Sequence, residues 1–228
     1  IEKYYIQAMK NSDRYRSLKS EGLSEKDIKA NFKEKTNMRV FTWAGDKDTI
    51  MSPWDSLRYY KHFLNTGMVS IEPQTGHVKV YVGGINYKHF KFDNAKLGRR
   101  QVGSTFKPFV YAAAMRDSEL SPCYEMENSP VTFEDFDNWT PKNSNDSREG
   151  ENVTLKWALA NSVNFISAAL IKDYTTPQAV VALVKQMGIT TPMEAYPSIC
   201  LGTSDLSVME MAGAMSTFVN KGIHKEPI

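Results

Sequence analysis

The sequence has 228 residues, of which 41% are hydrophobic and 24% charged, and its formal net charge is +2. This length suits one large domain, or one domain with a small addition. Since no basic stripe with interleaved aromatic side chains is present, nothing indicates a nucleic-acid partner. The uncharged run over 157–171 is about 15 residues long, short of the ~20 that a membrane-spanning helix needs.

Two cysteines, Cys123 and Cys200, lie far apart in the sequence, which leaves a disulfide between them open. Neither their spacing nor the four isolated histidines indicates a metal site. The chain opens within a helical pattern, without an initiator methionine or a signal peptide, and we expect it to be part of a longer protein.

Residues 1–66 are predicted to form a helical and short-strand region that precedes the main domain. Helical patterns cover 1–35, and β-branched and aromatic residues predict a strand over 38–43. A further helix begins after Ser52, which is followed by a proline in the first turn, and Gly67 is expected to follow its last turn.

Residues 67–228 are predicted to combine a hairpin with several helices. Val78, Val80 and Val82 alternate with other residues, and the turn EPQTGH separates them from a second strand-like run, which predicts a hairpin over 68–84. Residues 118–152 are irregular and rich in acids, and a loop of this length is usually functional or an insertion. That loop holds three Asn-x-Ser/Thr triplets, which arise easily by chance and begin at Asn138, Asn145 and Asn152. Helical patterns cover 104–115, 154–174, 176–188 and 204–222.

Ser104 and Lys107 lie three positions apart in the segment GRRQVGSTFKPFVYAAA, residues 98–114. On a helix, side chains at this spacing share one face, so the lysine amine can reach the serine hydroxyl. A serine becomes a strong nucleophile when a base takes its proton, and a lysine acts as a base only when neutral. Because the ordinary lysine pKa is about 10.4, catalysis near neutral pH requires burial or a helix N-terminus to lower it.

Pro108 indicates that this pair lies at the start of a helix. Proline lacks an N–H and is poorly tolerated inside a helix, so Ser104, four residues earlier, belongs in or next to the first turn. Gly103 lets the chain enter that turn tightly, and free backbone N–H groups there can hold an oxyanion. The alternative is an ordinary N-cap serine followed by a solvated lysine.

A second polar group follows a short helix farther along the chain. Ser162 and Asn164 lie two residues apart in ALANSVN, the only Ser-x-Asn in the sequence. A second hydroxyl near Ser104 can relay protons between the lysine and a leaving group, and an amide can hold the lysine and a substrate carbonyl together. Taken alone, such a triplet is more often a polar junction between helices.

The order Ser-x-x-Lys and then Ser-x-Asn is that of penicillin-recognising serine enzymes. RRQVGSTFKPFVYAAA closely resembles the nucleophile segment of class A penicillin-binding proteins. VSIEPQTGHVKVYVGG is similar to the opening hairpin of their transpeptidase domain, VTLKWALANSVNFISAAL to its second motif, and CLGTSDLSVMEMAGAMSTFVNKGIHKEP to the helix before its third. FTWAGDKDTIMSPWDS is similar to the linker region in the bacteroidete-like branch of this family. The resemblance covers 67–228 nearly continuously and 38–66 more weakly. It implies an α+β fold of the penicillin-binding transpeptidase and serine β-lactamase type, an antiparallel sheet with flanking helices, incomplete at the C-terminus.

Two features depart from the family pattern. Val102 stands where the family usually has a proline before the Gly-Ser pair, which we expect to alter loop stiffness rather than chemistry. The third motif, Lys-Thr/Ser-Gly on an edge strand, does not occur in the 228 residues, and the resemblance places it beyond Ile228. We therefore expect little or no turnover from this chain alone, and self-association through an unfinished sheet edge.

The resemblance implies a D,D-transpeptidase that cross-links peptidoglycan stem peptides through a serine acyl-enzyme. Ser104 would be the nucleophile, Lys107 its base, Ser162 the proton relay and Asn164 the amide, and β-lactams would acylate the same serine. No metal or organic cofactor is implied. The parent protein would be anchored at the periplasmic face of the inner membrane, with a glycosyltransferase domain before this region, whereas this fragment would be soluble.

The same resemblance suggests three substrate contacts: Gly103 beside the nucleophile, and Trp139 and Asn143 in the segment WTPKN. Trp139 is equally well explained as an anchor for its loop. Two other interpretations stay open. One is a serine β-lactamase or D,D-carboxypeptidase-like hydrolase, in which water replaces the acceptor amine, and the other is a non-catalytic penicillin-binding scaffold or sensor.

Overall fold

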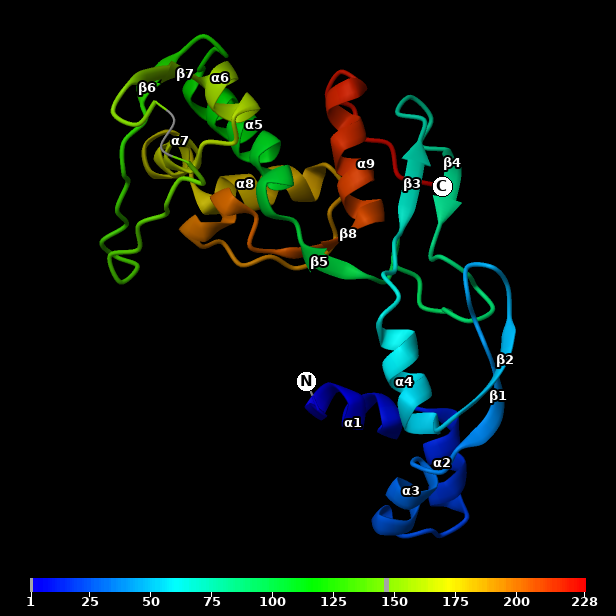
Figure 1. Cartoon of the computed structure of the whole chain (residues 1–228). Coiled ribbons are helices and arrows are strands. Elements are labelled where there is room, and N and C mark those ends of the chain that lie inside the picture. Colours follow the sequence, from blue (N-terminus) through cyan, green and yellow to red (C-terminus); the bar gives the residue numbers. More distant parts are fainter. Residues whose placement is uncertain (1, 146–147) are drawn as a thin grey trace. The chain divides into compact units, whose positions relative to one another are not determined.

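The computed structural model describes residues 2–145 and 148–228, and the chain divides into two compact units, Ile1–Asn65 and Thr66–Ile228 (Figure 1). Each unit has its own buried hydrophobic cluster. The Asn145 triplet extends into the two residues between the described ranges, so it lies outside them. Within those ranges, no helix is both long enough and apolar enough to cross a bilayer.

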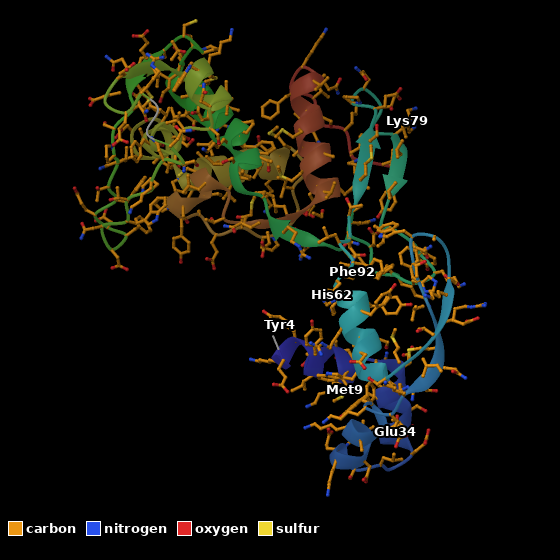
Figure 2. All side chains as sticks on the ribbon, in the orientation of Figure 1. Tyr4, Met9, Glu34, His62, Lys79 and Phe92 are labelled. Atoms are coloured by element: carbon orange, nitrogen blue, oxygen red, sulfur yellow. The ribbon has the colours of Figure 1, made fainter. Side chains whose placement is uncertain are left out.

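Unit 1 joins short helices to a hairpin. Serine side chains cap its second, third and fourth helices by accepting a hydrogen bond from the N–H three residues ahead, as predicted at Ser52. Its core consists of Met9, which Figure 2 labels, together with Ile28 and Phe32. The elements are α1 (Glu2–Lys10), α2 (Asp13–Ser20), α3 (Glu25–Asn31), β1 (Thr36–Val40), β2 (Lys47–Met51) and α4 (Pro53–Lys61).

Two local predictions for the start of the chain are wrong. The strand predicted over 38–43 ends at Val40 and pairs with β2, a strand that the sequence did not reveal. The helix predicted to reach Gly67 ends at Lys61. Gly67 serves a different purpose in unit 2, where a Cβ on it would lie 2.7 Å from the backbone nitrogen of Ala95. A close backbone approach, rather than a helix end, therefore requires glycine there.

Unit 2 has the predicted α+β composition. Its described strands form separate two-stranded antiparallel ladders, β3–β4, β5–β8 and β6–β7, rather than the single sheet that the resemblance implied. The strands are β3 (Met68–Ile71), β4 (Val78–Val82), β5 (Arg99–Gln101), β6 (Glu125–Glu127), β7 (Asn152–Thr154) and β8 (Asp205–Ser207). The helices are α5 (Lys107–Ser118), α6 (Leu155–Ala160), α7 (Asn164–Ala169), α8 (Pro177–Gln186) and α9 (Val208–Val219), with the 3-10 turns η1 (Gly103–Phe106) and η3 (Pro197–Leu201) and the π-helical turn η2 (Leu170–Tyr174).

Helix α5 is the buried centre of unit 2. Phe109, Val110, Ala113 and Ala114 are fully buried, and buried side chains occur around the whole helix, as in a helix enclosed by a core. The helices α6, α7 and α8 and the turns η2 and η3 pack against it. The core therefore holds the first residue of α5, Lys107, at a defined place relative to α7.

The helix predicted over 154–174 is interrupted. Helix α6 ends at Ala160, α7 begins at Asn164, and Ser162 between them has a φ of +55°, in the left-handed region. A residue with a side chain pays about 1–2 kcal/mol for this conformation, so neighbouring contacts must hold it. The loop predicted over 118–152 is also less irregular than expected, because its two ends form β6 and β7.

The hairpin β3–β4 forms as predicted and lies beside α9 (Figure 1). Val80 and Val82 are nevertheless exposed. At the start of β4, the Val78 N–H donates to the Ile228 carbonyl at 2.9 Å, and the Ile228 N–H donates to the Gly76 carbonyl at 3.0 Å. The β4 edge is therefore already paired at one end, and self-association through this edge stays a prediction.

Glu210 connects α9 to the loop that precedes η3. Its carboxylate completes a capping box with Ser207 and also accepts hydrogen bonds from the backbone and hydroxyl groups of Thr190 and Thr191. Burial opposes ionisation, but hydrogen bonds from Thr191 and Ser207 outweigh it and lower the pKa of Glu210 to about 2. Ser207 belongs to β8, which pairs with β5, the strand before the turn that carries Ser104. The hydrogen bonds of Glu210 therefore also stabilise the β5–β8 ladder.

Glu210→Gln is expected to destabilise the protein by about 1.5–3 kcal/mol at pH 7, the usual value of hydrogen bonds to a charged group. The stabilisation by the carboxylate is complete above its ordinary pKa of 4.5 and is lost as the pH falls toward 2. Denaturant unfolding at pH 7 and pH 3 measures this, with Glu125→Gln on β6 as an exposed control. An equal cost of Glu210→Gln at both pH values would contradict the prediction.

Candidate active site

Ser104 lies in the 3-10 turn η1, directly before Lys107 begins α5. The Lys107 N–H donates to the Ser104 carbonyl, and Pro108 occupies the first turn of α5, as the sequence predicted. Ser104 is exposed, and no described residue forms a hydrogen bond with its hydroxyl. The backbone therefore presents an accessible hydroxyl at the start of a buried helix.

Two glycines hold this turn in place. Gly103 has a φ of +55° and donates its N–H to the Gly202 carbonyl at 2.9 Å. Gly202 has a φ of +70°, and a Cβ on it would lie 1.9 Å from the Gly103 carbonyl oxygen. The sequence analysis missed Gly202, whose only local signal is its position directly after the turn-forming segment Pro197–Leu201.

Lys107 is only 1% exposed, and its amine lies among polar atoms of the junction between α6 and α7. The Nζ atom is 2.6 Å from the Ser162 carbonyl oxygen, 3.0 Å from Ser162 Oγ and 2.6 Å from Asn164 Oδ1. Burial lowers the pKa of Lys107 to about 8. The structure thus brings Lys107, Ser162 and Asn164 together, as the sequence analysis expected.

These three partners fit both protonation states of Lys107. The Ser162 carbonyl and Asn164 Oδ1 can only accept, so they take two N–H groups in either state. The Ser162 hydroxyl can accept from a third N–H of the ammonium form or donate to the lone pair of the amine form. Lys107 can therefore gain or lose one proton without moving, and that proton faces Ser162 Oγ.

The orientation of the Asn164 amide follows from its other partner. Its Nδ2 donates to the Lys142 carbonyl at 2.7 Å, which leaves Oδ1 for the lysine. Asn143, in the same loop, accepts at Oδ1 from the backbone N–H groups of Asn164 and Phe165 at 2.9 and 3.2 Å. Asn143 thus lies against α7, and its expected contact with substrate stays a prediction.

Trp139 packs within its own loop. Its ring lies 5.4 Å, between centroids, from that of Phe133, and the two residues form a β-bridge. Trp139 also lines a depression with Phe136, Tyr196 and Pro197. The loop-anchor interpretation therefore has direct support, and the substrate contact expected from the resemblance stays a prediction.

Cys123 is exposed and Cys200 is buried, and both thiols are free, so the disulfide left open by the sequence is not formed. Burial raises the pKa of Cys200 to about 12, which keeps this thiol neutral beside Lys107. Within residues 2–145 and 148–228, no group of three histidine, cysteine or acidic side chains is arranged to hold a metal ion.

The sequence profile described as the penicillin-binding protein transpeptidase domain matches residues 66–228. The chain belongs to this transpeptidase family. A second profile, the penicillin-binding protein middle domain, matches residues 1–64. The transpeptidase resemblance noted from Ser104, Lys107, Ser162 and Asn164 is thereby confirmed at the level of the family.

Several individual relatives are named penicillin-binding protein 1A, which agrees with the class A resemblance. Penicillin-binding protein 1A of Aquifex aeolicus is 33% identical over 72% of this chain and 22% of its own length. Penicillin-binding protein 1A of Pseudomonas aeruginosa is 30% identical over 81% of this chain and 23% of its own. The crystal structure of penicillin-binding protein 1A from Haemophilus influenzae has a TM-score of 0.67 and 30% identity, over 72% of this chain and 24% of that one. The chain thus spans less than a quarter of the length of these relatives.

Gly202→Ala is expected to destabilise this transpeptidase domain by about 2 kcal/mol or more, because the new Cβ would strain the left-handed backbone and collide with Gly103. Gly222→Ala is the matched control, since Gly222 has a φ of +84° but open space around it, and strain alone should cost about 1 kcal/mol. Denaturant unfolding of both variants measures the difference. Equal costs would show that the contact between the two glycines is unimportant.

Lys107→Met is expected to remove a pH-dependent part of the stability. The folded pKa of about 8 lies below the ordinary value of 10.5, so the unfolded state binds more protons between these values. The stability of the unsubstituted protein, relative to Lys107→Met, should therefore rise as the pH increases from 8 to 10.5 and be constant below that window. Denaturant unfolding at pH 7, 9 and 10.5 tests this. Lys185→Met, which removes an exposed lysine on α8, is the control. If the stability of the unsubstituted protein relative to this variant rose by the same amount, the lowered pKa would not belong to Lys107.

Proposed function

We propose that Ser104 is the acylated nucleophile of a D,D-transpeptidase that cross-links peptidoglycan stem peptides. The observation that carries the proposal is the Lys107 amine, which is buried, has a lowered pKa and is held by Ser162 and Asn164 next to the turn that bears Ser104. Membership of the transpeptidase family supports the same assignment.

In the acylation step, Ser104 Oγ attacks the carbonyl carbon of the D-Ala–D-Ala bond while its proton passes to the neutral Lys107 amine, whose lone pair must turn from Ser162 Oγ toward Ser104. The Gly103 N–H already donates to Gly202, so the Ser104 N–H is the group at the start of η1 that is suited to hold the resulting oxyanion. No hydrogen bond joins Ser104 Oγ to the amine among the described residues, and such bonds between a nucleophile and its base often form only when substrate binds.

The carbon–nitrogen bond then breaks, and the departing D-Ala needs a proton. Lys107 supplies it through Ser162 Oγ, because the exchangeable proton of the lysine already faces that hydroxyl. An amine of a neighbouring stem peptide attacks the acyl-enzyme ester, loses its proton along the same route in reverse, and releases Ser104. A β-lactam would acylate the same oxygen, but its ring cannot depart as D-Ala does.

We extend the proposal to the whole protein on the basis of its relatives. A class A penicillin-binding protein carries a glycosyltransferase domain and is anchored in the inner membrane, with its catalytic domains in the periplasm. We propose the same arrangement here. The peptidoglycan strands made by the first domain would then supply the stem peptides that Ser104 joins.

The alternative function is hydrolysis, by a serine β-lactamase or D,D-carboxypeptidase-like reaction in which water attacks the acyl-enzyme. The match to the transpeptidase family over 66–228 favours the synthase. A thioester substrate separates the two, because a transpeptidase gives the amide product when an amine is added, whereas a hydrolase gives the acid at the same rate.

Labelling of the full-length protein with a fluorescent penicillin is expected to give a covalent product that survives denaturation. Ser104→Ala should abolish the label, and Lys107→Ala should slow it by about 10²–10⁴-fold, the usual contribution of a general base. Ser118→Ala is the matched control, since among the described residues that hydroxyl bonds only the Tyr174 carbonyl.

The outcomes separate the candidate functions. Label that persists in Ser104→Ala would assign the nucleophile to another residue. No label in the unsubstituted protein, with its fold intact, would favour the non-catalytic scaffold or sensor.

A further inference from the structure

Helix α7 lacks an N-terminal cap from its own sequence. The residue before it is Val163, which has no side-chain oxygen, and no side chain in that position bonds the first turn. The first N–H groups of a helix need external acceptors, particularly when they are partly buried. Asn143, 21 positions earlier than Asn164, provides one, because its Oδ1 accepts from the N–H groups of Asn164 and Phe165.

We infer that Asn143 is a positioning residue for the active site, which caps α7 from the neighbouring loop and thereby holds the Asn164 amide against the Lys107 amine. The inference rests on the proposed function, because it concerns the same lysine. Asn143 itself bonds the backbone of α7, so its effect on Lys107 passes through Asn164.

The loop holds Asn164 at two points. The Lys142 carbonyl accepts from Asn164 Nδ2 at 2.7 Å, while Asn143 accepts from the Asn164 backbone N–H at 2.9 Å. One bond sets which end of the amide faces Lys107, and the other sets where the residue begins the helix. Two adjacent residues of one loop therefore determine both the orientation and the position of the group that accepts from Lys107.

Asn143 is in turn held by Asn128. The Asn128 side chain is fully buried, accepts from Asn143 Nδ2 at 3.1 Å and donates to the Arg148 carbonyl at 3.0 Å. Its backbone N–H donates to the Glu151 carbonyl, and its carbonyl accepts from the Gly150 N–H, next to the β6–β7 ladder. Asn128 thus connects Asn143 to the β6–β7 ladder. These bonds fix the loop that carries Asn143 relative to Asn164.

This arrangement affects the protonation of Lys107. Asn164 Oδ1 stabilises the ammonium form more than the amine, so losing its position should lower the lysine pKa. A negative charge at position 143 should have the opposite effect. Cys200, on η3, is the titratable neighbour of Lys107 in the described part of the chain, and because its pKa is about 12 it carries no charge where Lys107 titrates.

The test compares Asn143→Ala with Asn143→Asp by NMR titration of the Lys107 side chain. Asn143→Ala removes the cap and should lower the lysine pKa. Asn143→Asp keeps oxygen acceptors for the two N–H groups, loses the donor to Asn128 and adds a negative charge, which should raise the lysine pKa. A substitution that merely loosened the fold would not move the two variants in opposite directions.

A second measurement is the rate of acylation by fluorescent penicillin in the full-length protein, at a temperature where circular dichroism shows each variant to be folded. Asn143→Ala should be about tenfold to a hundredfold slower, because small misplacements of a catalytic group cost up to about 10²-fold. Asn143→Asp should recover most of the rate at alkaline pH. Asn220→Ala, which loses a bond to the Ile223 carbonyl outside the site, is the matched control and should change neither measurement.

Unchanged titration in both variants, or shifts in the same direction, would overturn the inference. If Asn143→Ala does not fold, an upward shift in Asn143→Asp still supports it and the absence of a shift still refutes it. Failure of the unsubstituted protein to form a Ser104-dependent label would refute the proposed function alone, because the titration does not depend on turnover.

Discussion

The buried amine of Lys107 constrains how the segments of unit 2 pack, because it needs hydrogen-bond partners inside the core. An unpaired charge inside a protein is strongly destabilising, so Lys107 needs partners that it cannot find on its own helix. The Ser162 carbonyl, the Ser162 hydroxyl and Asn164 Oδ1 supply them. The first residue of α5 and the junction between α6 and α7 must therefore meet closely, although they belong to different parts of the sequence.

Three features of the domain stabilise the contact between the start of α5 and the junction of α6 and α7. The apolar surface of α5 places its N-terminal end inside the core, and the contact between Gly103 and Gly202 sets the turn that carries Ser104. The left-handed backbone of Ser162 brings two of its oxygens to the same amine. Burial then leaves the amine with a pKa of about 8, close to the value at which it can both take and return a proton.

Sequence predictions were correct where a feature depends on neighbouring residues, and less complete where it depends on residues distant in sequence. The cap at Ser52, the helix start near Pro108 and the hairpin over 68–84 depend on neighbouring residues, and all three were predicted correctly. The apolar pattern continues through the break within 154–174, and only the polar triplet of Ser162 and Asn164, read as following a short helix, indicated it. Gly67 was misassigned because the backbone that approaches it, at Ala95, is distant in sequence.

The family, the order of the polar motifs and the placement of Ser104 in front of a helix follow from local sterics and motif spacing, which can be read directly from the residues. The atoms that surround the Lys107 amine depend on the fold, since its partners lie 55 and 57 positions away. The same holds for Gly202 and Asn143, whose roles arise from backbone groups that folding brings to them. A hydrogen bond across a core has no periodicity or spacing in the sequence, because it exists only once burial has excluded water from both partners.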